Sequence, residues 1–134
     1  MPEILPIRFE KQRAAECTAL GAEFLPDAMA YAAYEAGSPL VICQFTISED
    51  KGTILAFNSD PKTENTLNYL TVRAVLAFME ICGAESCLCH DGILPPELYE
   101  KTGFSLSHDE TYAFSFNIPN TDNKTEIPKP DGEE

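Results

Sequence analysis

The stretch TILAFNSDPKTENTLNYLTVRAVLAFMEICG, residues 53–83, decides the fold of this chain. Its first six residues, TILAFN, are mostly apolar or β-branched and predict a strand. From Leu67 onward apolar residues recur at helical spacing until Gly83, a natural helix terminator. A strand that leads through a loop into so apolar a helix predicts that the helix lies against a sheet.

The long helix should be apolar over most of its surface. We expect one apolar face to be formed by Leu67, Leu70, Ala74, Phe78 and Ile81, and to be widened by Val72, Val75, Leu76 and Met79. The polar residues Thr66, Arg73 and Glu80 follow one another at seven-residue intervals and leave only a narrow solvent-facing stripe. The pattern therefore predicts a helix that is covered on most sides.

Upstream of this stretch the sequence predicts an edge strand, a helix and a β-hairpin. The segment ILPIRF (4–9) is a short apolar strand interrupted by Pro6, and residues 10–20 have the apolar spacing of a helix. Residues 27–37 are ambiguous between helix and strand. The turn residues AGSP and the β-branched segment 40–47 that follow them favour a hairpin.

Downstream, the sequence predicts three further elements. They are a buried strand SCLCH (86–90), a helix PPELYEKTG (95–103) and a closing hairpin FSLSHDETYAFSFNI (104–118). The order of elements predicts an α/β (α+β) fold in which a mixed sheet carries helices on its faces. Residues 1–118 form one domain in this interpretation, and the polar, acidic residues 119–134 form a disordered tail.

Charge and hydropathy exclude two classes of partner. The 134 residues carry a net charge of −13 with only nine scattered Lys and Arg, whereas nucleic-acid binding needs a basic stripe. No apolar run approaches the ~20 residues that cross a bilayer, and the N-terminal sequence lacks a signal-peptide core. We expect a soluble, cytoplasmic protein that binds neither nucleic acid nor membrane.

The five cysteines predict reduced thiols in the core, because they are odd in number and lie in apolar segments. The cluster CGAESCLCH has the spacing C-x4-C-x-C-H and lacks the C-x2-C pair of usual zinc sites. On a strand, Cys87 and Cys89 share one face and His90 points away. No metal site is therefore expected.

The segments RAVLAFMEICGAE (73–85) and LYEKTGF (98–104), in this order after a strand and a loop, resemble the GCN5-related N-acetyltransferase (GNAT) family. The resemblance covers about residues 40–116. It implies a mostly antiparallel sheet splayed between its fourth and fifth strands, where acetyl-CoA enters. It also implies that the pantetheine pairs with the strand backbone at Ala56, Phe57 and Asn58, and that an amine of a small molecule or peptide attacks the thioester directly.

The family binds the pyrophosphate with a loop of the form Q/R-x-x-G-x-G/A, which falls here on TENTLN. Thr63 stands where Gln or Arg is expected, and Thr66 and Asn68 replace the two glycines. Glycine matters there because a phosphate must approach the backbone closely. Lys62 supplies positive charge next to the acidic Glu64, so the loop is degenerate as a pyrophosphate site.

The same loop has a second interpretation. The side chains of Thr63, Asn65 and Thr66 are suited to capping the helix N-terminus, which would occupy the N–H groups that a phosphate uses. The stretch is then an ordinary capped helix start.

Tyr99, in LYEKTGF, corresponds to the tyrosine that in many family members protonates the leaving thiolate; its ring could equally pack in the core. Gly92 replaces an asparagine that often contacts the cofactor. A general base is not evident, since TILAFN has no carboxylate. His90 and His108 are each followed by an aspartate but are expected to be structural or exposed.

Two functions of different classes remain open. One is a GNAT-type N-acetyltransferase with acetyl-CoA as cosubstrate and an unidentified amine as acceptor. The other is a catalytically inactive GNAT-fold binding or regulatory module, a possible homodimer through exposed sheet edges, that has lost CoA binding.

Overall fold

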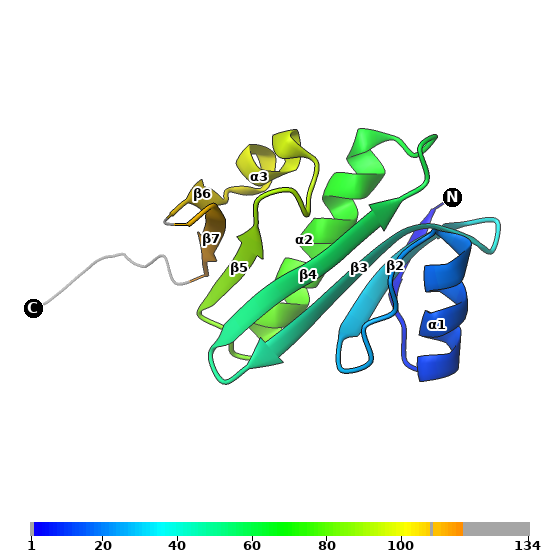
Figure 1. Cartoon of the computed structure of the whole chain (residues 1–134), viewed down its shortest axis with the longest axis horizontal. Helices are drawn as coiled ribbons and strands as arrows, with labels where there is room; N and C mark the ends of the chain where they lie inside the picture. Colours follow the sequence, from blue (N-terminus) through cyan, green and yellow to red (C-terminus); the bar gives the residue numbers. More distant parts are fainter. Residues whose placement is uncertain (1, 108, 117–134) are drawn as a thin grey trace, which may run out of the picture.

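The computed structural model describes residues 2–107 and 109–116 (Figure 1). The elements are β1 (Glu3–Pro6), α1 (Glu10–Ala19), β2 (Met29–Glu35), β3 (Ser38–Ser48), β4 (Lys51–Ser59), α2 (Asn65–Ile81), β5 (Ser86–His90), α3 (Pro96–Thr102), β6 (Ser105–Leu106) and β7 (Thr111–Ser115). The strands form one sheet in the order β1-β2-β3-β4-β5-β7-β6. Only β4 and β5 are parallel among these neighbours, so the predicted mixed, mostly antiparallel sheet is confirmed.

Helices cover both faces of the sheet, as the sequence predicts. α2 passes behind β4 in Figure 1, and α1 lies beside β2. Cys17 of α1 packs against Ala30 of β2 and Ile42 of β3. The main core, between α2, α3 and the sheet, includes Phe45, Ile54, Met79 and Leu98. A smaller cluster around Cys17 and Ile42 lies beneath α1.

The apolar face of α2 differs from the predicted one. Its buried residues are Leu67, Asn68, Thr71, Val72, Val75, Leu76 and Met79, whereas Leu70 is 45% exposed and Ile81 is 83% exposed. The sequence offers two overlapping apolar stripes, and the structure buries the one through Val72 and Val75. The prediction that this helix is covered on most sides is therefore wrong, because the sheet contacts only one of its faces.

The hairpin between β2 and β3 is confirmed and turns at Ala36 and Gly37. Both residues have positive φ, 53° and 83°, which suits a tight turn whose twist matches that of the strands. β1 is an edge strand, and Pro6 pairs with Tyr31. The N–H of the next residue, Ile7, donates to the Ala30 carbonyl at 3.0 Å, so Pro6 lies where the sheet needs no N–H from it.

Within residues 2–107 and 109–116, no helix is long and apolar enough to cross a membrane. The predicted tail, 119–134, and His108 lie outside the described residues.

Candidate functional site

A gap opens in the sheet where β4 and β5 separate. The two strands pair from Lys51↔Ser86 to Ile54↔Cys89, and β4 then continues to Ser59 beside β3 alone (Figure 1). Leu55 is an extra residue at this point, since Ile54 pairs with Phe45 and Ala56 pairs with Gln44. A β-bulge bends its strand and increases the local twist, so the bulge at Leu55 accounts for the separation.

The unpaired side of β4 presents backbone groups to this gap. The N–H of Asp60 donates to the carbonyl oxygen of Leu40 on β3, at 2.7 Å. Because antiparallel strands alternate in the direction of their hydrogen bonds, Asn58 and Ala56 also direct their backbone groups to β3. Ser59 and Phe57 direct theirs to the gap. Of the three predicted pantetheine contacts, Phe57 therefore has its backbone available.

A groove of about 390 Å³ lies beside this strand end. Phe57 and Ser59 form its β4 side, and residues 91–96, which link β5 to α3, form the rest of its lining. Asp91 is the charged residue of this lining. The groove therefore combines free strand backbone with an apolar wall, an arrangement suited to an extended, amide-containing chain such as pantetheine.

The helix that follows the gap starts without a side-chain cap. α2 begins at Asn65, its N-cap residue is Glu64, and no side chain hydrogen bonds to the cap position. Thr63 instead donates its hydroxyl proton to the Leu40 carbonyl, at 3.4 Å. The prediction that Thr63, Asn65 and Thr66 cap the helix is therefore wrong, because the chain reaches the helix in extended geometry that turns Thr63 toward β3. In the described chain the N–H groups of Asn65 and Thr66 have no acceptor.

The other residues predicted in this loop are divided between surface and interior. Lys62 is exposed, and its backbone N–H donates to a carboxylate oxygen of Asp60 at 2.9 Å. Asn68 is 7% exposed and accepts a hydrogen bond from the Ser59 hydroxyl at 2.8 Å. Asn68 thus joins α2 to the open end of β4, next to the groove.

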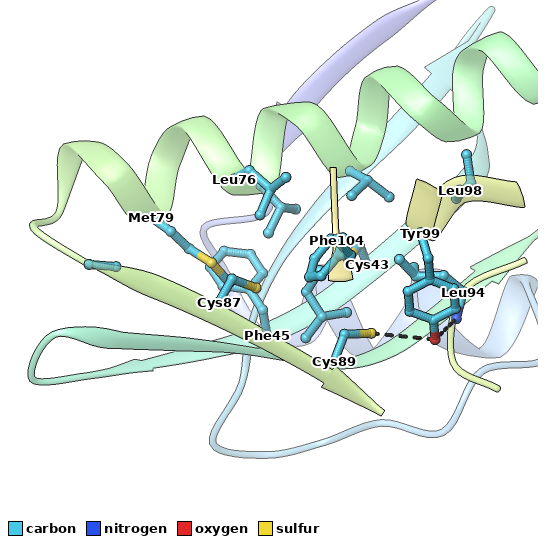
Figure 2. Close-up of a cluster of buried hydrophobic side chains, with 14 residues drawn as sticks. Cys43, Phe45, Leu76, Met79, Cys87, Cys89, Leu94, Leu98, Tyr99 and Phe104 are labelled. Carbon is cyan, nitrogen blue, oxygen red and sulfur yellow. Dashed lines mark hydrogen bonds between the residues drawn. The ribbon is translucent and has the colours of Figure 1, made fainter. Parts of the chain in front are cut away.

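Tyr99 is buried, with 2% of its surface exposed. Figure 2 shows its hydroxyl between Cys89 and the backbone of Leu94. The hydroxyl donates to the carbonyl of His90 and accepts the N–H groups of Ile93 at 3.2 Å and Leu94 at 3.1 Å. The ring stacks on Tyr112 with 3.8 Å between centroids. The hydroxyl therefore faces the inside of the groove's wall, and Tyr99 is not a lining residue.

The cysteines are mostly buried. Cys17, Cys43, Cys87 and Cys89 lie in the interior, whereas Cys82 is exposed at the end of α2, so the prediction of a core thiol is wrong for Cys82. Burial raises the pKa of Cys87 to about 12 and that of Cys89 to about 11, which keeps both thiols protonated and unreactive at neutral pH. Among the described residues, no three His, Cys, Asp or Glu side chains are grouped to hold a metal ion.

Sequence reasoning missed Ser59 and Asp91 as residues of the groove. The backbone of Ser59 is free because β4 extends beyond its pairing with β5. The sequence does not show where that pairing ends, so it could not reveal this residue. It also missed the buried pair Arg13 and Gln44. The Gln44 carboxamide accepts from Arg13 at 3.3 Å and from the Leu25 N–H at 3.1 Å, which ties the loop after α1 to β3.

Comparisons with known proteins agree with this geometry. A GNAT family acetyltransferase from Brucella melitensis, solved with acetyl-CoA, has a TM-score of 0.63 at 15% identity, over 88% of this chain and 90% of that chain. The ribosomal-protein-S18-alanine N-acetyltransferase of Escherichia coli has a TM-score of 0.69 at 14% identity, over 92% and 99%. The aminoglycoside 6'-N-acetyltransferase of Enterococcus faecium has a TM-score of 0.69 at 12% identity, over 90% and 99%.

No protein-family model matches the sequence, and no curated protein matches it in sequence. The relationship is therefore visible in the structure: the chain has the fold of the GNAT acetyltransferases.

Proposed function

We propose that this protein is an N-acetyltransferase that transfers the acetyl group of acetyl-CoA to a primary amine. The observation that carries the proposal is the unpaired β4 backbone at Phe57 and Ser59, opened by the bulge at Leu55 beside an apolar groove. The structural likeness to a GNAT acetyltransferase solved with acetyl-CoA supports this choice of donor.

In the proposed complex the chain holds the donor at two places. The N–H and C=O groups of Phe57 and Ser59 pair with the amides of pantetheine as a neighbouring strand would. The free N–H groups of Asn65 and Thr66, with the positive end of the α2 dipole and Lys62, face the diphosphate. Thr63 and Asn68 serve the site indirectly, because their side chains fix the loop and the helix to the sheet.

The transfer itself needs no covalent enzyme intermediate. The amine nitrogen attacks the thioester carbonyl carbon, a C–N bond forms, and the C–S bond breaks. The amine loses one proton and the departing thiolate gains one, so the products are an acetamide and CoA thiol. The protein contributes by holding the two reactants in contact in the groove.

One set of observations favours a second function, a GNAT-fold module without acyl transfer. The groove's lining contains Asp91 and no basic residue, and the approach to α2 carries Asp60 and Glu64 beside Lys62. Negative charges at these positions oppose the binding of the CoA phosphates. In this alternative the exposed sheet edge at β1 is the surface for a partner or a second copy.

Thermal unfolding with acetyl-CoA and CoA separates the two functions. Ligand at 100 times its dissociation constant stabilises the folded state by about 2.7 kcal/mol. Stabilisation by millimolar CoA supports the transferase, and no shift in melting temperature supports the binding module.

A pair of substitutions then locates the binding. Ser59→Pro removes an N–H directed to the gap and leaves the β3 pairing intact, because proline is tolerated where no ladder bond is donated. Ser59→Ala removes only the hydroxyl and is the matched control. We expect Ser59→Pro to weaken CoA binding at least about tenfold relative to Ser59→Ala, the loss of about one hydrogen bond. Equal affinities of the two variants would contradict backbone pairing at Ser59.

A further inference from the structure

We propose that Tyr99 is a positioning residue that holds the wall of the groove in place through its hydroxyl group, and that it is not the proton donor to the leaving thiolate. The consequence for catalysis rests on the proposed function, whereas the structural role of the hydroxyl does not.

The Tyr99 hydroxyl is fully engaged in hydrogen bonds to the protein backbone. It donates its one proton to the His90 carbonyl and accepts two N–H groups, from Ile93 and Leu94. A phenol has one donor and about two acceptor sites, so every hydrogen-bonding site of this group is in use. A proton donor to substrate would have to break the bond to His90 first.

The Tyr99 ring is packed in the core between other aromatic rings. Tyr99 is 2% exposed, stacks on Tyr112 and meets the ring of Phe104 edge to face, with 5.9 Å between centroids. Burial raises the pKa of Tyr99 to about 12. A phenol this buried and this weakly acidic is a poor match for a thiolate that needs a proton at neutral pH.

The Tyr99 hydroxyl supports the segment that forms most of the groove's lining. Residues 91–96 supply six of the eight residues that line the groove, and they lie outside helices and strands except for Pro96 at the start of α3. At the start of this segment, the backbone N–H of Asp91 donates to the Glu110 carbonyl, at 2.8 Å. Next along this segment, the N–H groups of Ile93 and Leu94 both donate to the Tyr99 hydroxyl. The Ile93 N–H also has a longer bond to the His90 carbonyl, at 3.4 Å, so Leu94 depends on Tyr99 more than Ile93 does. The hydroxyl is thus the main anchor of the wall's centre.

Amide hydrogen exchange in the ligand-free protein tests the anchor directly. In Tyr99→Phe the ring stays and the hydroxyl is lost, so the amide of Leu94 should exchange at least about tenfold faster, the loss of roughly one hydrogen bond. The Ile93 amide should change less, because it keeps the His90 carbonyl as an acceptor. Tyr112→Phe is the matched control, because the Tyr112 hydroxyl makes no hydrogen bond within residues 2–107 and 109–116. Unchanged exchange in Tyr99→Phe would overturn the proposal.

Wild-type protein provides a test that does not depend on the variant's folding. Both amides should be protected, although they lie in a loop, and Leu94 should be protected as strongly as the amides of β5. Exchange at the rate of an open loop would overturn the proposal.

Steady-state kinetics separates positioning from proton donation. For Tyr99→Phe we expect KM for acetyl-CoA to rise about tenfold, kcat to change less than about threefold, and the pH profile of kcat to keep its shape. A lost alkaline limb with unchanged KM would identify Tyr99 as the acid and overturn the proposal. If wild-type protein neither binds CoA nor shows turnover, the proposed function fails, and the exchange experiments decide the structural role of Tyr99.

Discussion

Two irregular segments lie at opposite faces of the sheet, and each is held by one buried polar side chain. The β5–α3 segment, 91–95, is anchored by the neutral hydroxyl of Tyr99. The α1–β2 segment, 20–28, is anchored by the guanidinium of Arg13, which donates to the carbonyls of Leu25 and Pro26. Both anchors satisfy backbone groups that neither helix nor sheet can satisfy.

The two anchors differ in charge and in what surrounds them. Arg13 is 6% exposed and packs over the Phe24 ring, with its guanidinium carbon 4.4 Å from the ring centroid. Its bonds to carbonyls and to Gln44 are charge-assisted and stronger than those of a neutral hydroxyl. The α1–β2 segment is therefore fixed more firmly than the β5–α3 segment, which forms the wall of the groove.

The largest expected effect is therefore at Arg13. Arg13→Met keeps the apolar stem but removes the charged donor to the carbonyls of Leu25 and Pro26 and to the Gln44 oxygen. The Leu25 carbonyl keeps the Ala28 N–H and the Gln44 oxygen keeps the Leu25 N–H, so the Pro26 carbonyl is the one left without a donor. We expect a loss of about 3 kcal/mol in the free energy of unfolding, measured by urea denaturation. Arg73→Met, at an exposed position of α2, is the matched control and should change stability by less than about 0.5 kcal/mol. A loss below about 1 kcal/mol at Arg13 would contradict the ranking of the anchors.

The second effect is at Tyr99 and should be smaller. Tyr99→Phe should lower the free energy of unfolding by about 1–2 kcal/mol, because neutral hydrogen bonds contribute less than charged ones. The double variant Arg13→Met/Tyr99→Phe should be additive within about 0.5 kcal/mol, since the two sites share no partner. Clear non-additivity would mean that the two segments are coupled through the sheet, and the two-anchor description would be wrong.

The third effect is a dependence of the free energy of unfolding on pH that arises from the Tyr99 hydroxyl. Burial raises its pKa in the folded protein to about 12, above the value near 10 of the unfolded chain. Below about pH 10 the phenol is protonated in both states and its contribution to stability is complete; as the pH rises toward 12, the unfolded chain loses the proton first and stability falls. The stability gap between wild type and Tyr99→Phe should therefore narrow from pH 10 to pH 12 in matched urea titrations. A constant gap would show that the hydroxyl titrates as an exposed phenol.

The order of strands and helices could be predicted because each is encoded locally. The β-branched segment 40–47, the turn AGSP and the glycine at Gly103, which has φ of 105°, each specify their element within a few residues. The choice between two apolar stripes on α2 could not be predicted. Leu70 and Val72 are equally apolar, and the sheet decides which of them is buried.

The hydrogen-bond partners at the candidate site could not be predicted from the sequence. The resemblance assigns the pyrophosphate loop to TENTLN, residues 63–68. The predicted capping by Thr63 is wrong because Leu40, distant in sequence, accepts its hydroxyl proton instead. The bonds of Tyr99 depend on how residues 90–94 fold back over α3, which no local pattern encodes. Hydrogen-bond partners depend on contacts that form only in the folded chain.

The smallest expected effect compares one aspartate in each segment. Asp91 lines the groove and Asp27 is exposed in the α1–β2 segment. Asp91→Asn removes a negative charge beside the proposed site of a polyanionic ligand, so it should tighten CoA binding about two- to threefold at low salt, and the gain should shrink as salt screens the charge. Asp27→Asn removes the same charge elsewhere and should leave the affinity unchanged, as measured by calorimetry. Equal gains in both variants would show that only net charge matters. An unchanged affinity of Asp91→Asn would place CoA away from the wall that Tyr99 holds.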